Sequence, residues 1–501
     1  MTRRLPRLLF ALASSGLVGT AAASQAGEAF TLAVIPDSQI QSLNDAWVMS
    51  LSDQARWIRE NVTAENIALA THVGDVVQGE IAEGLFVSTI PAFAWDAQLQ
   101  RTDAALSELD QANLDTVLPY SISSGNHDYL PVGDKNNAED PISPTGFTSR
   151  YGPSRYTGYA SQWYGGSDPT GFNHYQFFEG GGHSYLHLNL EYEPDNPDLD
   201  GDLDRGGFAD AIAWAQSVID ANPGIPTIVS THKYLTDDDG GNPDGFDDTG
   251  YQGDGFDDTF GGFRTDTGEA VWNALIRSNP QIFMTLNGHD HEGPYREDGE
   301  YAQVSYNDAG LPVYEILADY QDYANPLTGN DPYLRLIELD PAAGTITNKT
   351  FSPTFEAFQN DPLAIADRLD AVLDEFEAGV PVARYLGEDF IQIMLFEDIP
   401  GYEDFATQVT QLLDPEGELP FDFAITGSRA DAEALILDFF ELTDRSQLDK
   451  IDFSPYLTDA DSQFTFAATF DASGRPVPEP ASLVLVALGA MALAGSRRRA
   501  R

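Results

Sequence analysis

The sequence contains no cysteine, so disulfides and thiolate metal sites are both excluded. Any bound metal must therefore be held by His, Asp, Asn or Gln side chains. Basic residues are also scarce, because 26 Lys and Arg stand against 80 Asp and Glu and give a formal net charge of -54. Such a surface repels nucleic acids and anionic membranes, so we expect no nucleic-acid-binding surface. It suits an exported protein or one that binds divalent cations.

The N-terminus has the layout of a secretory signal peptide. Arg3, Arg4 and Arg7 precede an apolar stretch at 8–18, and small residues follow. This order of basic, apolar and small residues predicts a signal peptide over residues 1–23. The pair Arg3-Arg4 leaves export by the twin-arginine route open as an alternative.

The C-terminus carries a second targeting pattern. Pro478-Glu479-Pro480 leads into an apolar run at 481–494, and arginines follow at 497–501. The run is shorter than the roughly 20 residues of a typical membrane span, and its basic end is expected to stay in the cytoplasm. Residues 477–501 resemble the PEP-CTERM sorting signal of Gram-negative bacteria. The resemblance implies a short transmembrane helix, transient membrane association, removal of the tail by a sorting peptidase, and a cell-surface or extracellular protein.

Strand-like and helix-like segments alternate up to about residue 290, which predicts an α/β core. Strands are expected at 30–35, 67–73, 116–122, 174–178, 184–191, 226–230 and 282–286, and helices at 45–61, 95–112, 208–222 and 269–277. Further strands follow at 302–306, 312–317, 333–339 and 345–350. This late run of strands predicts antiparallel members of the sheet.

Two other regions differ from this alternation. Residues 131–170 are rich in Gly, Pro, Ser and Tyr, which predicts a long functional loop. Residues 353–450 contain no histidine and predict a block of acidic amphipathic helices, at 362–379, 402–414 and 430–444. We interpret this block as an insertion or subdomain that packs on the core. Return strands are expected within residues 451–475.

A short polar motif lies just beyond each of five predicted strands. The motifs are Asp37-Ser38-Gln39, Gly74-Asp75, Gly125-Asn126-His127-Asp128, Thr231-His232-Lys233 and Gly288-His289-Asp290-His291. Ligands of open α/β sheets bind beyond the carboxyl ends of the strands, where these motifs fall. Their oxygen and nitrogen donors are typical of Mn, Fe or Zn sites. Each motif alone is compatible with an ordinary turn, so the prediction depends on their joint occurrence.

With these five motifs in this order, residues 30 to about 352 resemble the calcineurin-like metallophosphoesterases. The resemblance implies an α/β fold, the family's four-layer α/β/β/α sandwich, with its catalytic domain at 28–352 and the acidic helical insertion after it. It also implies a secreted two-metal phosphoesterase that hydrolyses a phosphomonoester or phosphodiester by attack of a hydroxide bridging the metals. A nucleotide and a phosphorylated glycan are open as substrates.

The resemblance also implies a role for each site residue. One metal, a divalent or trivalent Mn, Fe or Zn ion, would be held by Asp37, Gln39, Asp75 and His291. The second would be held by Asp75, Asn126, His232 and His289, with Asp75 bridging the two. His127 would protonate the leaving group as general acid, and Asp128 would orient its ring.

The first motif departs from the family pattern. The family usually has Asp-x-His there, whereas Gln39 holds the histidine position in this chain. Members with Gln at this place have a run similar to Leu317-Ala318-Asp319-Tyr320-Gln321 downstream. An amide oxygen binds Zn or Fe more weakly than imidazole does, so we expect the first metal site to be the weaker one.

Several features have alternative interpretations. The tail and the helical block also fit a surface or matrix protein that keeps the fold without catalysis. The acidic loops at 195–204 and 237–258 lack the spacing of an EF-hand, so solvated loops are expected and calcium binding is the lesser alternative. His72 and His187 are expected in the core, and His174 and His183 away from the site. The aromatic residues at 151–164 either shape a pocket or pack inside.

Overall fold

The protein is described from a computed structural model of the 501-residue chain. The structure describes residues 27–78, 92–129, 146–194, 211–236, 264–290, 299–321, 324–330, 332–377, 429–458, 460 and 462–478. The signal peptide, the helix at 402–414, both acidic loops and the apolar run of the tail, all predicted above, lie outside these residues. No helix within the described residues has the length and apolarity needed to cross a membrane.

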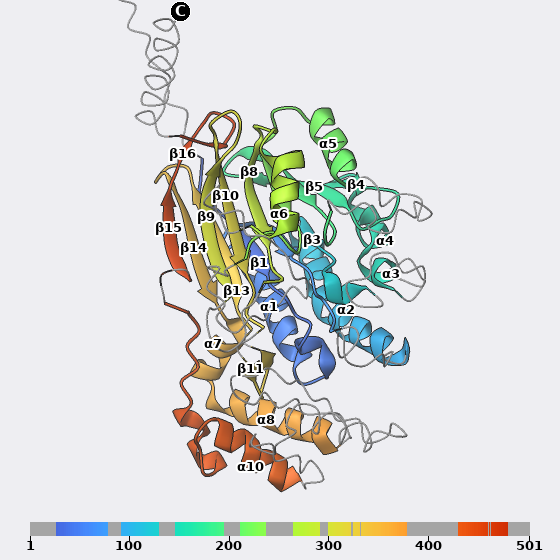
Figure 1. Cartoon of the computed structure of the whole chain (residues 1–501). Coiled ribbons are helices and arrows are strands. Elements are labelled where there is room, and N and C mark those ends of the chain that lie inside the picture. Colours follow the sequence, from blue (N-terminus) through green and yellow to red (C-terminus); the bar gives the residue numbers. More distant parts are fainter. Residues whose placement is uncertain are drawn as a thin grey trace, which may run out of the picture.

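The fold is mixed α/β and contains two large mixed sheets, as Figure 1 shows. The first has six strands in the order β15-β14-β13-β1-β2-β3. Their bounds are β1 Phe30–Ile35, β2 Ile67–His72, β3 Tyr120–Ile122, β13 Leu334–Asp340, β14 Thr345–Phe351 and β15 Gln463–Ala467. Strands β1, β2 and β3 run parallel, whereas β13, β14 and β15 add antiparallel pairs. The predicted antiparallel continuation is therefore confirmed.

The second sheet has seven strands in the order β4-β5-β6-β7-β8-β10-β9. Their bounds are β4 Tyr164–Ser167, β5 His174–Gly180, β6 His183–Asn189, β7 Thr227–Ser230, β8 Ile282–Asn287, β9 Glu300–Tyr306 and β10 Pro312–Ala318. Strands β6, β7, β8 and β10 are parallel, and β4, β5 and β9 are antiparallel to their neighbours. The parallel centre matches the continuous apolar character of these strands.

The alternation of side chains along β1 shows how the layers pack. Ala33 and Ile35 join a buried cluster with helices α1 (Val48–Asn61) and α2 (Ala92–Asp115). Leu32 and Val34 point the other way and join a cluster with strands of the second sheet. Successive side chains of a strand face opposite sides, so this sheet is covered on both faces.

The second sheet has a helical cover of its own. One buried cluster joins its strands β6, β7, β8 and β10 to α5 (Ala211–Ala221), α6 (Asp266–Val271) and the π-helical turn Trp272–Ile276. The predicted helix at 269–277 is thus present, with its second half in the wider π form.

The prediction of a long loop over 131–170 is wrong for its described part. Residues 146–170 contain α3 (Phe147–Tyr151), α4 (Pro153–Tyr156), a 3-10 turn (Thr157–Tyr159) and strand β4. Pro153 is tolerated because it occupies the first turn of α4, where no helical N–H is needed. The aromatic residues of this segment, including Tyr151, Tyr156 and Trp163, are buried against α2 and β3. Packing in the core is therefore their observed role.

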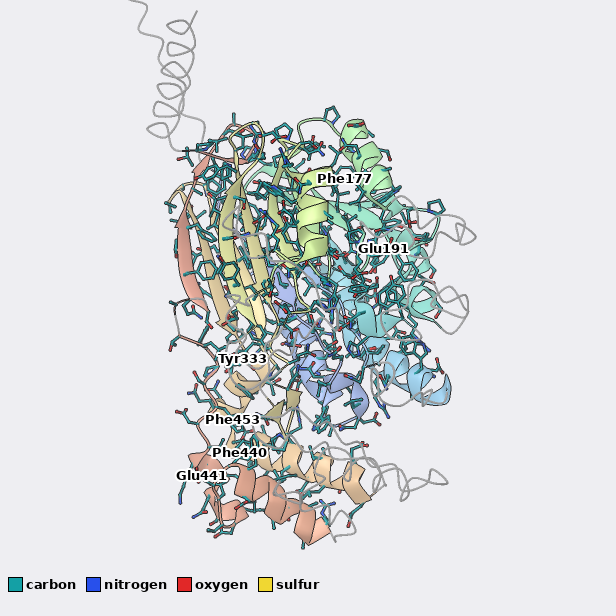
Figure 2. The ribbon with its side chains drawn as sticks, in the orientation of Figure 1. Phe177, Glu191, Tyr333, Phe440, Glu441 and Phe453 are labelled. Atoms are coloured by element: carbon teal, nitrogen blue, oxygen red, sulfur yellow. The ribbon has the colours of Figure 1, made fainter. Side chains whose placement is uncertain are left out.

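The C-terminal helices form a further buried cluster beside the sheets. They are α7 (Pro353–Asn360), α8 (Pro362–Glu377), α10 (Arg429–Phe439) and the 3-10 segment Arg445–Lys450. An aromatic series runs from Tyr333 through Phe355 and Phe453 to Phe440, with ring centroids 5.5, 4.9 and 5.8 Å apart (Figure 2). These contacts fix the helices to the lower end of the first sheet.

Short strand pairs complete the described structure. They are β11 (Ala324–Asn325) with β12 (Gly329–Asn330), and β16 (Thr469–Phe470) with β17 (Pro476–Val477). The second pair is tied to β6 because the Tyr185 hydroxyl donates to the Gly474 carbonyl at 2.9 Å. Strands β15 and β16 lie within residues 451–475, where return strands were predicted.

The histidines expected in the core are buried and hydrogen-bonded. His72 Nε2 lies 2.9 Å from Ser38 Oγ, and His187 Nε2 lies 2.9 Å from Ser230 Oγ. Burial lowers the pKa of each to about 3, so both rings are neutral at pH 7. His174 is also buried and stacks on Tyr156 at 4.7 Å, while His183 begins β6. The predictions for His72 and His187 are confirmed.

Candidate functional site

Strand ends from both sheets meet at the candidate site. β1, β2 and β3 of the first sheet deliver the loops that contain Asp37, Asp75 and Asn126. β7 and β8 of the second sheet deliver His232 and His289. Backbone hydrogen bonds tie these loops together, since Ser38 N–H donates to the Asp75 carbonyl at 3.0 Å and Gly288 N–H to the His232 carbonyl at 3.2 Å.

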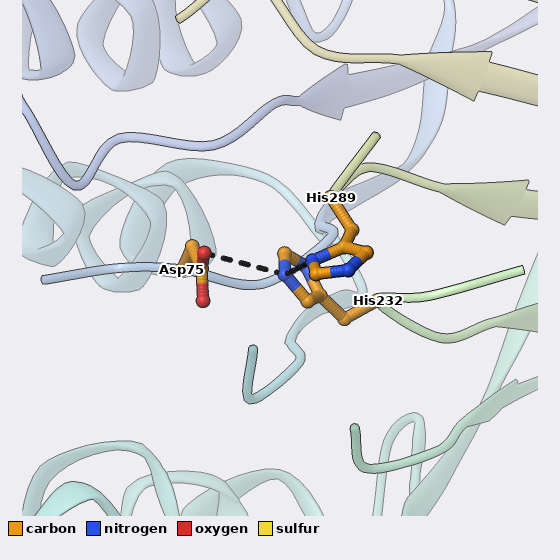
Figure 3. Close-up of side chains that lie close together, drawn as sticks. All are labelled: Asp75, His232 and His289. Atoms are coloured by element: carbon orange, nitrogen blue, oxygen red, sulfur yellow. Dashed lines mark hydrogen bonds and ion pairs between the residues drawn. The ribbon is translucent and has the colours of Figure 1, made fainter. Parts of the chain in front are cut away.

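Four of the seven predicted metal ligands lie around one atom of a fifth, His232 Nε2. Asn126 Oδ1 lies 3.0 Å from it, His289 Nδ1 3.2 Å, Asp75 Oδ2 3.3 Å and Asp37 Oδ2 3.9 Å. Figure 3 shows Asp75, His232 and His289 directed toward one another. Asp75, His232 and His289 each place a potential ligand atom within 4.8 Å of the others.

The tautomer of His232 explains why this cluster favours a cation. His232 Nδ1 lies 3.0 Å from the Val73 carbonyl, which can only accept, so Nδ1 carries the hydrogen. His232 Nε2 faces Asn126 Oδ1 and Asp75 Oδ2, which both present lone pairs. Such groups repel one another when buried, and a cation between them removes the repulsion.

Two buried oxygens of the first motif support the same interpretation. Within the described residues, neither Asp37 Oδ1 nor Gln39 Oε1 receives a hydrogen bond. Burial, together with the nearby Asp319 and Asp75 carboxylates, raises the pKa of Asp37 well above its usual range. Buried acceptors without donors are costly, and metal coordination is one way to satisfy them. The residues present therefore fit an oxygen- and nitrogen-coordinated metal.

Asp75 has a different electrostatic environment. Burial opposes its ionisation, but the nearby His232 and His127 rings, a hydrogen bond from the His232 side chain and one from the His127 backbone N–H outweigh burial and hold the pKa of Asp75 below its usual value. Asp75 is thus the ionised carboxylate of the cluster. Its Oδ1 accepts the His127 backbone N–H at 2.8 Å, which leaves Oδ2 beside His232.

Two site residues adopt a backbone conformation that L-residues rarely take. Asp75 has φ 49° and His289 has φ 76°, both in the left-handed region. Such conformations persist where the surrounding structure requires them, and they cluster at functional sites.

Glycines beside the site allow the close approach of its groups. A Cβ on Gly74, at φ +120°, would lie 2.4 Å from His232 Nδ1, and one on Gly288 would lie 2.1 Å from Asp37 Oδ1. Neither position can therefore carry a side chain without moving a site residue.

Asp128 does not occupy the position expected of it. Its carboxylate accepts backbone N–H groups of Gly125, Val76 and Val77 at 2.8–3.2 Å. The His127 ring is instead oriented by the Gln78 carbonyl, which lies 2.7 Å from Nδ1. The expectation that Asp128 orients His127 is thus corrected: Asp128 fixes the loops after β2 and β3, because their amides need an acceptor once buried.

The two remaining predicted ligands are Gln39 and His291. Gln39 is buried and its amide nitrogen donates to Gln321 Oε1. His291 lies outside the described residues.

Asp319 and Gln321 also lie at the site, although neither was predicted as a site residue. They directly follow β10, which runs parallel to β8, so they obey the same strand-end rule that identified the other motifs. Tyr192, which follows β6, also lies beside the site, with its ring centroid 6.0 Å from His232 and 5.9 Å from His289.

Several known proteins are similar to parts of this chain. An uncharacterized Bacillus subtilis (strain 168) protein, YvnB, is 25% identical over 331 residues, which cover 66% of this chain. The match spans only 20% of YvnB's length. Two solved structures each have a TM-score of 0.34. One, GAP50, the anchor in the inner membrane complex of Plasmodium, is 13% identical, with 65% of this chain and 85% of that chain covered. The other, PhoD, is 11% identical, with 66% of this chain and 67% of that chain covered.

The C-terminal tail matches a known sorting signal. Residues 476–499 match the PEP-CTERM protein-sorting motif, which confirms the prediction made from Pro478-Glu479-Pro480 and the arginines after it. The motif implies an interaction between this tail and a sorting system. It marks proteins that are exported and sorted to the cell surface in Gram-negative bacteria, and this chain carries it.

Proposed function

We propose that this protein is an exported phosphoesterase of the calcineurin-like type that binds two metal ions. The observation that carries the proposal is the convergence of Asp37, Asp75, Asn126 and His289 on His232 Nε2. Asp75, Asn126, His232 and His289 would hold one metal. Asp37, Gln39, Asp75 and His291 would hold the other. When bound, Mn, Fe or Zn ions neutralise the charge of a phosphoester and activate water for attack.

The side chain of His127 is suited to proton transfer to the leaving group. Its Nδ1 is committed as a donor to the Gln78 carbonyl at 2.7 Å, so the ring exchanges a proton with substrate through Nε2. The ring is only half-buried, which gives a substrate access to it. Its backbone N–H holds Asp75 Oδ1 at 2.8 Å, so the acid and the bridging carboxylate are positioned by the same residue.

The domain organisation follows from the same proposal. The catalytic domain spans 28–352 and has the four-layer α/β/β/α arrangement. Support comes from the buried cluster that joins both sheets and from the helix clusters on their other faces. Residues 353–450 are the helical insertion, 451–475 return to the sheet, and 1–23 and 477–501 are export signals.

The test of the function combines metal analysis with a substrate screen. Full-length mature protein, purified without chelator, is expected to bind Mn, Fe or Zn and to turn over one class among phosphomonoesters, phosphodiesters, nucleotides and phosphorylated glycans. A chelator should abolish turnover, and added metal should restore it. Bound metal with no turnover of any class would instead support the non-catalytic surface protein. Absence of metal binding would contradict both the site and the activity.

A separate prediction concerns the sorting tail. Strand β17 ends at Val477, so the Pro-Glu-Pro tripeptide begins directly after the last described strand. We expect the sorting peptidase to cut near this tripeptide and to remove the terminal arginines. Mass spectrometry of protein from the native host should find a C-terminus near Pro480. Intact Arg501 on exported protein would mean that the tail is a permanent anchor.

A further inference from the structure

Three buried side chains form a hydrogen-bonded series at the edge of the candidate site. Gln321 Nε2 donates to Asp319 Oδ2 at 3.1 Å, and the Gln321 backbone N–H donates to Asp319 Oδ1 at 3.0 Å. Gln39 Nε2 in turn donates to Gln321 Oε1. Asp319, Gln321 and Gln39 are 1%, 2% and 4% exposed, so water does not substitute for these bonds.

The carboxylate at one end sets the direction of the whole series. Both carboxyl oxygens of Asp319 accept hydrogen bonds from Gln321, one from its backbone N–H and one from Nε2, so Gln321 turns its NH2 group toward Asp319. Its oxygen is then left to accept from Gln39, which must also use its NH2 group. The Gln39 oxygen consequently points away from the series, and among the described residues no donor reaches it.

The loop that carries Asp319 and Gln321 is rigidly held. Asp319 N–H donates to the Gly299 carbonyl at 2.8 Å. The intervening Tyr320 hydroxyl donates to Glu300 Oε1 at 2.7 Å, and Arg335 Nη2 donates to the same oxygen at 2.6 Å. These bonds tie Tyr320, which lies between Asp319 and Gln321, to the buried pair of Glu300 and Arg335. The series is therefore anchored to the scaffold.

We propose that Asp319 and Gln321 are positioning residues that hold the Gln39 amide with its oxygen toward the first metal. They would compensate for the absence of the histidine that the related enzymes have at this position, because an amide that rotates freely would present N–H hydrogens to a cation half of the time. The inference rests on the proposed function, since it concerns one of the two metals. Asp37 Oδ1 and Gln39 Oε1, which receive no hydrogen bond from the described residues, mark the place where that metal would bind.

The direct test is Mn²⁺ binding to the full mature protein, measured by calorimetry and by electron paramagnetic resonance of the bound ions. Asp319→Asn can present either end of its amide to Gln321, so the direction of the series is lost. We expect the affinity of the weaker Mn²⁺ to fall by about 10–100-fold, as for other residues that support metal ligands. The tighter Mn²⁺, at His232, should keep its affinity within about 2-fold. Gln321→Met, which removes the series without a change of charge, should have the same effect.

A double variant separates orientation from charge. The double variant combines Gln39→Glu with Asp319→Asn. Both oxygens of the new carboxylate at position 39 can accept a hydrogen bond or bind a metal. With Asn at position 319, the Gln321 amide can flip and donate to that carboxylate. This double variant has the parent's net charge and should recover most of the lost affinity. Asp308→Asn, which removes a surface carboxylate paired with Arg277, serves as the charge control and should bind as the parent does.

Three results would overturn the inference. Asp319→Asn or Gln321→Met could bind both Mn²⁺ ions as the parent does, the double variant could bind no better than Asp319→Asn, or the parent could bind a single Mn²⁺ that depends on His232 alone. The first two results leave the proposed phosphoesterase activity intact if the parent is active. Complete absence of Mn²⁺ and turnover in the parent would instead refute the proposed function, and the inference with it.

Discussion

Asp75→Asn should lower phosphoesterase turnover by more than about 100-fold and weaken the binding of both metals. Replacing a residue that merely supports a metal ligand already lowers metal affinity or activity by about 10–100-fold. Asp75 is proposed to bridge two ions directly, so its replacement should have a larger effect. The substitution keeps the shape of the side chain and removes its charge. Metal content of the purified variant and its rate on the parent's best substrate are the two measurements.

The contacts of Asp75 explain why an isosteric amide cannot replace it. Oδ1 accepts the His127 N–H at 2.8 Å, and Oδ2 lies 3.3 Å from His232 Nε2. Asparagine has one oxygen, so if that oxygen keeps the bond to His127, an NH2 group faces His232. That group would occupy His232 Nε2 with a hydrogen bond and would have no lone pair for a metal. The opposite orientation places NH2 against the His127 N–H, where two donors repel.

Asp53→Asn provides a matched control. Asp53 lies on α1, and its Oδ2 accepts Arg368 Nη2 at 3.1 Å, on the side of the helix that faces α7 and α8. The variant loses one carboxylate charge, as Asp75→Asn does, and should keep metal content and turnover. If Asp75→Asn turned over substrate at the rate of this control, the bridging role would be wrong.

Much of the site could be predicted because strand ends are visible in a sequence. Apolar runs such as Phe30–Ile35 and Ile282–Asn287 are buried on both faces, and parallel strands bring their carboxyl ends to one edge. Asp37 and His289 are far apart in sequence, yet each follows such a run. The rule that ligands bind beyond the carboxyl ends of parallel strands required only the position and chemistry of each motif, and no detail of packing.

The directions of hydrogen bonds could not be predicted in this way. Asp128 follows His127 directly, which favoured a contact between their side chains. In the folded chain, three buried backbone amides after β2 and β3 donate to the Asp128 carboxylate instead. Gln39 and Gln321 are 282 residues apart in the sequence, and their contact depends on how β10 lies beside β8. Only the tertiary structure places such residues together.

The segment around Tyr151 illustrates a second limit of the sequence. Its Gly, Pro and Ser content is typical of loops, but local composition does not report tertiary burial. The Tyr151 hydroxyl is 2.7 Å from Thr102 Oγ1 on α2, and Arg155 lies over the Tyr120 and Tyr151 rings. These long-range contacts stabilise short helices that would not form alone.

His127→Gln should lower the rate by roughly 10²–10⁴-fold on substrates with poor leaving groups and should retain both metals. The backbone N–H of His127 donates to Asp75 Oδ1 at 2.8 Å, and the substitution leaves this hydrogen bond unchanged. Glutamine can keep a hydrogen bond to the Gln78 carbonyl, but its amide does not release a proton. The variant therefore removes proton transfer while it preserves the position of Asp75.

The leaving group distinguishes an acid from a residue that only binds substrate. An alkoxide needs a proton as the ester bond breaks, whereas an activated aryl oxide leaves without one. His127→Gln should therefore be much less harmful on aryl phosphates than on alkyl phosphates of similar size. His183→Gln, a substitution at the start of β6, should leave both rates unchanged. Equal losses of rate on the two substrate classes would assign His127 to substrate binding. A loss of bound metal would assign it to the metal centre. Either result would exclude His127 as the general acid.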